Sequence, residues 1–263
     1  MRAAELYPRP PMPARLPLSA VLITFNCVGP LRATLESLRF CDEILAVDSG
    51  STDGSVELLQ EFGARVISEP WRGFGPQKQF AVDQAAYDWV LCIDSDEIVS
   101  PELQASILQA LETSGDSAYE FPRRNRFLGH YLKHGEGYPD YSLRLYDRRQ
   151  ARWTDDVVHE KVITLGTVSC LKGDLLHHSE DSIESYLAKQ NRYTTLAAQA
   201  LAAEGVEVST GKLVLSPLFR FIKFYFLRGG CLDGAPGLIH ILIGCFNSFA
   251  KYAKVIELNR KKS

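Results

Sequence analysis

The stretch Trp89-Val90-Leu91-Cys92-Ile93-Asp94-Ser95-Asp96-Glu97 decides how the rest of the chain is interpreted. Its first five residues are all apolar, which is typical of a central parallel strand covered on both faces. Three acids follow within four residues, and crowded carboxylates repel one another unless a cation neutralises them. Asp94 and Asp96 would share one side of the chain if the strand conformation continued. The stretch therefore predicts a buried strand with a cation or ligand site at its carboxyl end, although a solvated loop before a helix would use the same acids.

Strand and helix patterns alternate around this stretch. Short strands are expected at 18–24, 43–47 and 65–67, and helices at 30–38, 51–59 and 74–86. A further helix opens at Pro101, where Ser100 is placed to cap it. This alternation predicts an α/β fold, in which helices cover both faces of an open, mostly parallel sheet.

Ligands bind such sheets outside the carboxyl ends of the strands. Three polar stretches should therefore line one crevice: Thr24-Phe25-Asn26, Asp48-Ser49-Gly50 and Asp94-Ser95-Asp96. Asp48 is suited to accept a hydrogen bond from a nucleobase N–H, and Phe25 either stacks on a base or belongs to the core. Lys78 opposes the helix dipole in a first turn, which favours a phosphate or sugar contact. Neither a GxGxxG nor a GxxxxGK[ST] pattern occurs, which argues against dinucleotide and P-loop sites.

The pattern changes after residue 118. Short strand-like runs and a polar loop beginning at Arg123 predict a mixed or antiparallel extension of the sheet. Helices are expected at 182–203, 216–228 and 238–258. The chain is thus expected to consist of a loose leader at 1–16, a catalytic domain at 17–210 and a basic helical tail at 211–263.

The tail differs from the rest of the chain in charge. The whole chain has a formal net charge of −3, yet residues 212–263 carry nine Lys or Arg and only two acids. Basic and aromatic side chains together at 218–228 favour an interfacial helix on an anionic membrane, with packing against the catalytic domain or a partner as the alternative. The excess of Phe, Leu and Ile argues against nucleic-acid binding.

The remaining composition bears on the compartment. The six cysteines include no CxxC pair, which favours free thiols in a reducing environment. Residues 1–16 lack the apolar core of a signal peptide. The longest apolar run, 237–250, is short for a membrane span. We therefore expect a cytoplasmic protein that is peripheral on the inner face of the cytoplasmic membrane.

Four motifs together resemble the inverting family-two glycosyltransferases of the GT-A fold, over about residues 18–112. They are Thr24-x-Asn26, Asp48-x-x-Ser51-x-Asp53-Gly54, Gly75-x-Gln77-Lys78-Gln79 and Asp94-Ser95-Asp96-Glu97. Later motifs are similar to those of bacterial lipopolysaccharide inner-core β-glucosyltransferases. These are Tyr138-Pro139-Asp140, Arg144-Leu145-Tyr146, Val158-His159-Glu160, His178 and Gly229-Gly230-x-x-Asp233-Gly234.

The resemblance implies a UDP-sugar donor, with glucose as the expected sugar, Mg²⁺ or Mn²⁺ as cofactor, and a glycolipid acceptor such as the lipopolysaccharide inner core. Asp48 would bind the base with Thr24 and Asn26 nearby. Asp94 would act in catalysis and, with Ser95 and Lys78, contact the sugar or phosphates. Asp96 would be the main metal ligand. The alternatives are a polyprenyl-phosphate or protein acceptor, or a nucleotide-sugar-binding assembly partner that is not an enzyme.

An inverting transferase also needs a carboxylate base on the acceptor side. Many family members carry a Glu-Asp pair there, whereas this chain has one only at Glu180-Asp181. His159-Glu160 is the candidate instead, with Glu160 as the base and Asp155 and Asp156 as competitors. His178 is a candidate for the metal shell or the diphosphate, and a structural role is its alternative.

Overall fold

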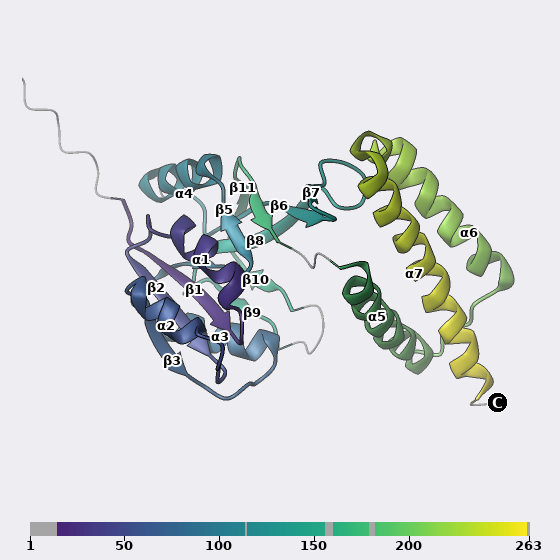
Figure 1. The fold of residues 1–263 in the computed structure, drawn as a ribbon, viewed down its shortest axis with the longest axis horizontal. Coiled ribbons are helices and arrows are strands. Elements are labelled where there is room, and N and C mark those ends of the chain that lie inside the picture. Colours follow the sequence, from purple (N-terminus) through teal and green to yellow (C-terminus); the bar gives the residue numbers. More distant parts are fainter. Residues whose placement is uncertain (1–14, 114, 156–159, 179–181, 262–263) are drawn as a thin grey trace, which may run out of the picture. The chain divides into compact units, whose positions relative to one another are not determined.

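The computed structural model describes residues 15–113, 115–155, 160–178 and 182–261 (Figure 1). The chain forms two compact units: the first unit contains residues 1–121 and 142–174, and the second unit contains residues 122–141 and 175–263. This division differs from the boundary expected at 210/211. The difference arises because α5 (Ile183–Ala203) packs against α7 (Gly234–Arg260) and so belongs with the carboxyl-terminal helices.

The first unit is built on a parallel sheet in the order β3-β2-β1-β4. Its strands are β1 (Leu18–Thr24), β2 (Glu43–Asp48), β3 (Arg65–Ser68) and β4 (Trp89–Cys92). Strand β8 (Asp140–Asp147) pairs antiparallel with β4, so the sheet is mixed beyond this point. The predicted α/β class and mostly parallel sheet are therefore confirmed.

Four helices accompany this sheet: α1 (Val28–Ser37), α2 (Ser55–Glu61), α3 (Phe74–Asp83) and α4 (Pro101–Thr113). Right-handed crossovers place α1 and α2 on one face, and α3 on the other because its connection runs back past β1. The core under α3 includes Val21, Val47, Val82 and Val90. The strand order reverses between β1 and β4, and the crevice at this reversal is the position where such folds bind ligands.

Strand β6 (Ala118–Phe127) runs through the residues where a polar loop was expected. In the second unit its later half pairs antiparallel with β7 (His130–Tyr131) and parallel with β12 (Leu175–His177). The loop prediction at Arg123 was wrong because neighbouring strands form hydrogen bonds with the backbone N–H and C=O groups of β6, whatever the polarity of its side chains. The first unit also contains β5 (Glu97–Val99), β11 (Val168–Cys170), and a hairpin of β9 (Ala151–Trp153) and β10 (Val162–Thr164).

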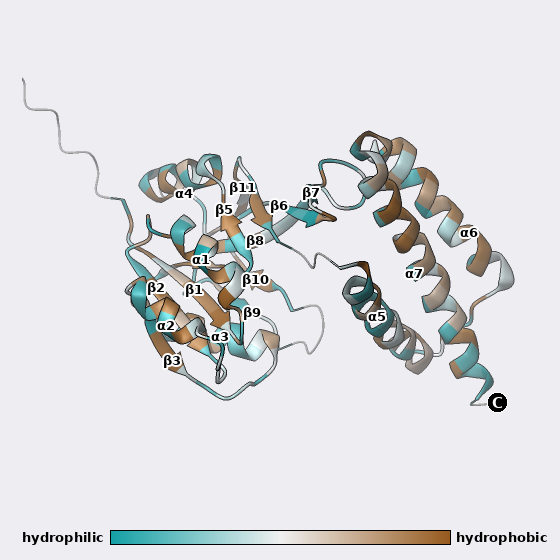
Figure 2. Cartoon of the chain, viewed as in Figure 1, coloured by the Kyte–Doolittle hydropathy of each residue, from teal (hydrophilic) through white to brown (hydrophobic). Residues whose placement is uncertain are grey.

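The second unit is mainly helical. It contains α5, α6 (Thr210–Phe221), the π-helical η1 (Ile222–Leu227), the 3-10 segment η2 (Gly230–Asp233) and α7. The side chains of Ser182 and Ser209 cap α5 and α6, and α7 packs against both helices. Figure 2 shows how apolar residues are concentrated in the amino-terminal half of α7.

Membrane-spanning potential in the described residues is restricted to one bent pair of helical segments. No single described helix combines the length and apolar character of a span. The segments Thr210–Leu227 and Gly230–Arg260 meet that test together, with a bend of 74° between them.

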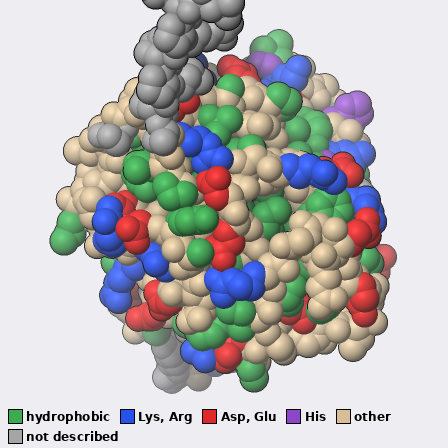
Figure 3. Space-filling view, turned by 90° about the vertical axis from the view of Figure 1, so that its left-hand side faces the viewer, with side chains coloured by type: hydrophobic (Ala, Val, Ile, Leu, Met, Phe, Trp, Pro, Cys, Tyr) green, Lys and Arg blue, Asp and Glu red, His purple; other side chains and the backbone are tan. Residues whose placement is uncertain are grey.

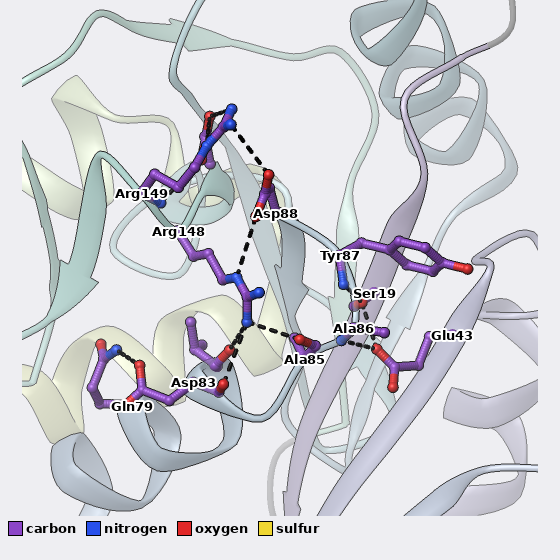
Figure 4. A network of polar contacts seen from close by, with 12 residues as sticks. Ser19, Glu43, Gln79, Asp83, Ala85, Ala86, Tyr87, Asp88, Arg148 and Arg149 are labelled. Atoms are coloured by element: carbon purple, nitrogen blue, oxygen red, sulfur yellow. Dashed lines mark hydrogen bonds and ion pairs between the residues drawn. The ribbon is translucent and has the colours of Figure 1, made fainter.

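The surface of the first unit is rich in paired charges. Figure 3 shows basic and acidic side chains interspersed on one of its faces. Figure 4 shows a network in which Arg148 donates to the carbonyl of Ala85 at 2.8 Å and lies 3.7 Å from Asp88. In the same network Glu43 accepts from Ser19 Oγ at 2.6 Å and from the N–H of Ala86 at 2.7 Å. These bonds secure the ends of α3 and β2 that lie away from the ligand crevice.

Candidate functional site

Asp48 organises the loop that follows β2. Its Oδ1 accepts from Thr24 Oγ1 at 2.9 Å and from Ser51 Oγ at 2.5 Å. Its Oδ2 accepts from the N–H groups of Gly50 at 2.9 Å and Ser51 at 2.8 Å. Burial raises the pKa of Asp48, but these hydrogen bonds outweigh it and leave the pKa below its usual value. Thr24 and Asp48 are thus held together as predicted, with Asp48 fixing the loop shape.

Asn26 joins the loops after β1 and β2. It adopts a positive φ of 46°, which Asn tolerates better than most residues. Its N–H donates to Ser51 Oγ and its Oδ1 accepts from the N–H of Thr52, both at 2.9 Å. Phe25 is 60% exposed beside it, so the core alternative for Phe25 was wrong. The two loops form one braced surface from which Phe25 projects.

Asp48→Asn is expected to lower the free energy of unfolding by about 1–3 kcal/mol, because an amide nitrogen would face donors in place of an acceptor. Urea unfolding measures this loss. Asp53→Asn, in the exposed part of the same loop, is the comparison and should cost less. Equal losses in the two variants would contradict the organising role of Asp48.

Asp94 lies between two buried cations. Its Oδ1 is 3.0 Å from Lys78 Nζ, and its Oδ2 accepts from Arg144 Nη2 at 2.8 Å. Burial raises the pKa of Asp94, but Arg144 and Lys78 outweigh this effect and hold the pKa well below its usual range. Strand β4 ends at Cys92 and Asp94 and Asp96 lie in a turn, so the strand conformation that would have placed them on one side does not continue. The N–H of Asp94 donates to Glu97 Oε2, which closes that turn.

Arg144 belongs to the Arg144-Leu145-Tyr146 motif noted in the sequence, but its pairing with Asp94 was not predicted. Only 7% of its side chain is exposed, and it also donates to the fully buried Glu97 at 3.2 Å. The antiparallel pairing of Leu145 with Leu91 brings Arg144 to the carboxyl end of β4. Its Nη1 is buried without a partner among the described residues. A cavity of about 10 Å³ beside Arg144, Lys78 and Asp94 has room for about one water.

Lys78 connects Asp94 to the candidate base. Its Nζ lies 3.3 Å from Glu160 Oε1 and 4.7 Å from the ring centre of Trp153. The side chain of Lys78 is only 9% exposed, so its position in the helix serves these contacts. Gly75 makes the approach possible, because a Cβ there would lie 2.2 Å from the carbonyl oxygen of Thr154. The β9–β10 hairpin can therefore pack directly over the start of α3.

The other predicted residues have separate positions. Ser95 and Asp96 are half-buried after β4, and the carbonyl of Ser95 accepts from Thr34 Oγ1 at 3.0 Å. His178 belongs to the second unit, where its Nε2 shares a hydrogen bond of 2.7 Å with the Tyr131 hydroxyl. Asp155 is exposed. Four candidates lie outside the described residues: Asp156, His159, Glu180 and Asp181.

The described residues include no group of three or more His, Cys, Asp or Glu side chains arranged to hold a metal. Lys78 and Arg144 pair with both oxygens of Asp94, and the half-buried Asp96 contributes a second carboxylate after β4. Mg²⁺ is commonly held by one or two carboxylates with substrate phosphates. The residues present therefore fit a cation that Asp96 and a bound diphosphate hold together.

Comparison with known proteins agrees with this geometry. The family described as Glycosyl transferase family 2 matches residues 19–169. The lipopolysaccharide core biosynthesis glycosyltransferase LpsC of Rhizobium meliloti (strain 1021) is 32% identical over 257 residues, 95% of each chain. An uncharacterized glycosyltransferase of Rickettsia typhi is 30% identical over 93% of this chain and 88% of its own length. The mannosyltransferase PcManGT of Pyrobaculum calidifontis, solved with GDP-Man and Mn²⁺, shares the fold with a TM-score of 0.52, 13% identity, and coverage of 99% of this chain and 90% of its own.

Proposed function

The chain belongs to glycosyl transferase family 2, and on that basis we propose that it transfers glucose from UDP-glucose to a sugar of the lipopolysaccharide inner core, with inversion. The similarity to LpsC over nearly the whole chain supports this class of acceptor. The observation that carries the proposal is the ion-pair chain in which Lys78 joins Asp94 to Glu160. It supports the proposal because Lys78 lies close to both carboxylates, and Asp94 would act on the donor side and Glu160 on the acceptor side.

The donor would occupy the crevice at the carboxyl ends of β1, β2 and β4. Thr24, Asn26 and the Asp48 loop would receive the nucleoside, and Phe25 is exposed where it could stack on a base. Asp96 would hold Mg²⁺ or Mn²⁺, which supplies neutralisation of the charge that develops on the leaving diphosphate. Asp94 and Ser95 would contact the sugar.

Glu160 would act on the acceptor. The acceptor hydroxyl oxygen bonds to C1 of the donor sugar, the bond from C1 to the diphosphate breaks, and UDP leaves. Glu160 would take the hydroxyl proton during this displacement, and attack opposite the leaving group inverts C1. Lys78 would keep the Glu160 carboxylate oriented. The enzyme would work at the cytoplasmic face of the membrane that carries its glycolipid acceptor.

UDP-glucose with Mn²⁺ is expected to raise the melting temperature, because a ligand at about 100 times its Kd adds about 2.7 kcal/mol to the stability of the native state. A thermal-shift screen of nucleotide sugars, with Mn²⁺ or with EDTA, measures this effect. Asp96→Asn should lose the Mn²⁺-dependent part of the shift. An equal shift in EDTA, or in Asp96→Asn, would contradict the metal role of Asp96.

Release of UDP in the presence of a lipopolysaccharide core oligosaccharide tests catalysis itself. A folded protein that binds UDP-glucose but releases no UDP with this acceptor would contradict the proposed transfer. UDP-glucose is the preferred donor if it gives both the largest shift and the fastest release.

A further inference from the structure

The helical segment α6–η1 presents an unusual apolar surface. None of its residues is buried, although α6 packs against α7. The exposed apolar side chains of this segment, here called the α6 strip, are Val214, Leu215, Leu218, Phe219, Ile222, Phe226 and Leu227. Their exposure ranges from 40% at Ile222 to 79% at Leu227. Contiguous apolar surface of this kind marks an interaction site more often than ordinary protein surface.

Basic side chains accompany the α6 strip. Lys212, Lys223 and Arg228 are exposed along it, and residues 210–232 include no acid. The nearest following acid, Asp233, is occupied by the N–H groups of Lys133 and His134 and by the His134 ring. Within the described part of the chain, Lys212, Lys223 and Arg228 form no ion pair, so the strip combines apolar side chains with positive charge. The face in Figure 3 instead mixes both signs.

This combination fits an anionic lipid surface better than a second protein. An interfacial helix has apolar side chains that enter the bilayer boundary and Lys or Arg that reach the headgroups. Two copies meeting through their strips would bring like charges together. The bent pair of helical segments also has the apolar composition of membrane-embedded sequence. The 74° bend between the segments and the exposed Lys223 in the first segment argue against a straight membrane span.

We infer that the α6 strip lies in the plane of an anionic bilayer and inserts its apolar side chains there. The inference deepens the proposed function, because a membrane glycolipid is the acceptor of that function. Its physical basis is independent of catalysis, since the strip contains none of the candidate site residues. The partner is the lipid surface itself, recognised by charge and apolar contact.

Vesicle sedimentation of the full-length protein tests the inference. Binding is expected to vesicles of phosphatidylcholine with phosphatidylglycerol, and to be much weaker with phosphatidylcholine alone. The double variant Phe219→Asp/Phe226→Asp should lower partitioning by about a hundredfold or more, since each lost apolar side chain removes more than a tenfold factor. Leu165→Asp, at a fully exposed apolar residue of the first unit, is the matched control and should bind normally.

The charge contribution is tested separately. Lys223→Gln/Arg228→Gln should lower binding to anionic vesicles by about tenfold or more at low salt, with little effect at high salt. Alkaline carbonate should release the bound protein from vesicles. Retention after carbonate would indicate a membrane span and overturn the in-plane arrangement.

Three further results test whether the α6 strip binds lipid, binds a second copy of the chain, or affects catalysis. Binding that is indifferent to Phe219→Asp/Phe226→Asp and to lipid charge would overturn the inference. A dimer in solution that this variant converts to monomer would assign the strip to a second copy instead. UDP release with a soluble core oligosaccharide should be unchanged in the variant, so failure of membrane binding is distinguishable from failure of the proposed transfer.

Discussion

Glu160→Gln is expected to lower kcat by about 10²- to 10⁴-fold, which is the usual contribution of a positioned general base. The amide cannot take the proton of the acceptor hydroxyl, yet it keeps the size of the side chain that packs beside Gly75. Lys78 can still bond to the amide oxygen, so the fold and the affinity for UDP-glucose should change little. Steady-state UDP release measures kcat, and calorimetry measures donor affinity.

Asp155→Asn is the matched control for this variant. Asp155 competes with Glu160 for the role of base and lies within the described residues, where it is exposed. The substitution removes the same charge as Glu160→Gln. Its kcat should stay near that of the unmodified enzyme. If Asp155→Asn lost activity while Glu160→Gln retained it, the base would be Asp155 and the role of Lys78 as a link between the two carboxylates would fail.

Asp94→Asn is expected to reduce both activity and stability. Removing one partner from a buried ion pair costs about 3–5 kcal/mol, because the remaining charges lose their compensation. We expect a loss at the lower end of this range, because 28% of the Asp94 side chain is exposed. In addition, Lys78 still pairs with Glu160, and Arg144 still pairs with Glu97. Urea unfolding at neutral pH measures the loss.

Asp88→Asn provides the comparison for stability. Asp88 also faces two arginines, with Arg149 at 3.2 Å, but its side chain is 46% exposed (Figure 4). Surface pairs of this kind contribute about 0–1 kcal/mol. Equal losses in Asp94→Asn and Asp88→Asn would show that the Asp94 pairs behave as ordinary surface pairs.

The stability gap between the wild type and Asp94→Asn should depend on pH. The folded state lowers the pKa of Asp94 below the unfolded value of about 3.9. The stabilisation is therefore complete above about pH 5 and is lost as the pH falls through the unfolded value toward the folded pKa. Unfolding curves of both proteins at successive acidic pH values should converge, and a constant gap would contradict the assignment.

The sequence was sufficient to predict the parallel sheet and the crevice at the carboxyl ends of its strands. Apolar runs between helical patterns predicted β1 to β4, and the rule for strand ends predicted that Thr24 and Asp48 lie close together, where they form a hydrogen bond. The family resemblance drawn from the four motifs is confirmed by the match over residues 19–169. These features depend on local periodicity and on a fold rule, both of which one sequence contains.

The partners of the predicted residues were harder to predict. Arg144 meets Asp94 only because β8 pairs antiparallel with β4 in one register, and several arginines of similar context precede it in the sequence. The link from Lys78 to Glu160 crosses 82 positions and depends on Gly75 admitting the hairpin. Such contacts are set by packing between distant segments, which the composition of either segment does not encode.

The path of the chain has a practical consequence for engineering. Strands β6 and β8 each change unit partway along their length, between Phe121 and Pro122 and between Tyr141 and Ser142, and the chain changes unit again between Asp174 and Leu175. No single cleavage can release either unit as an intact fragment. A chimaera that exchanges one whole unit between relatives would need to transplant two separate segments together, so recombination at one crossover point should yield misfolded hybrids.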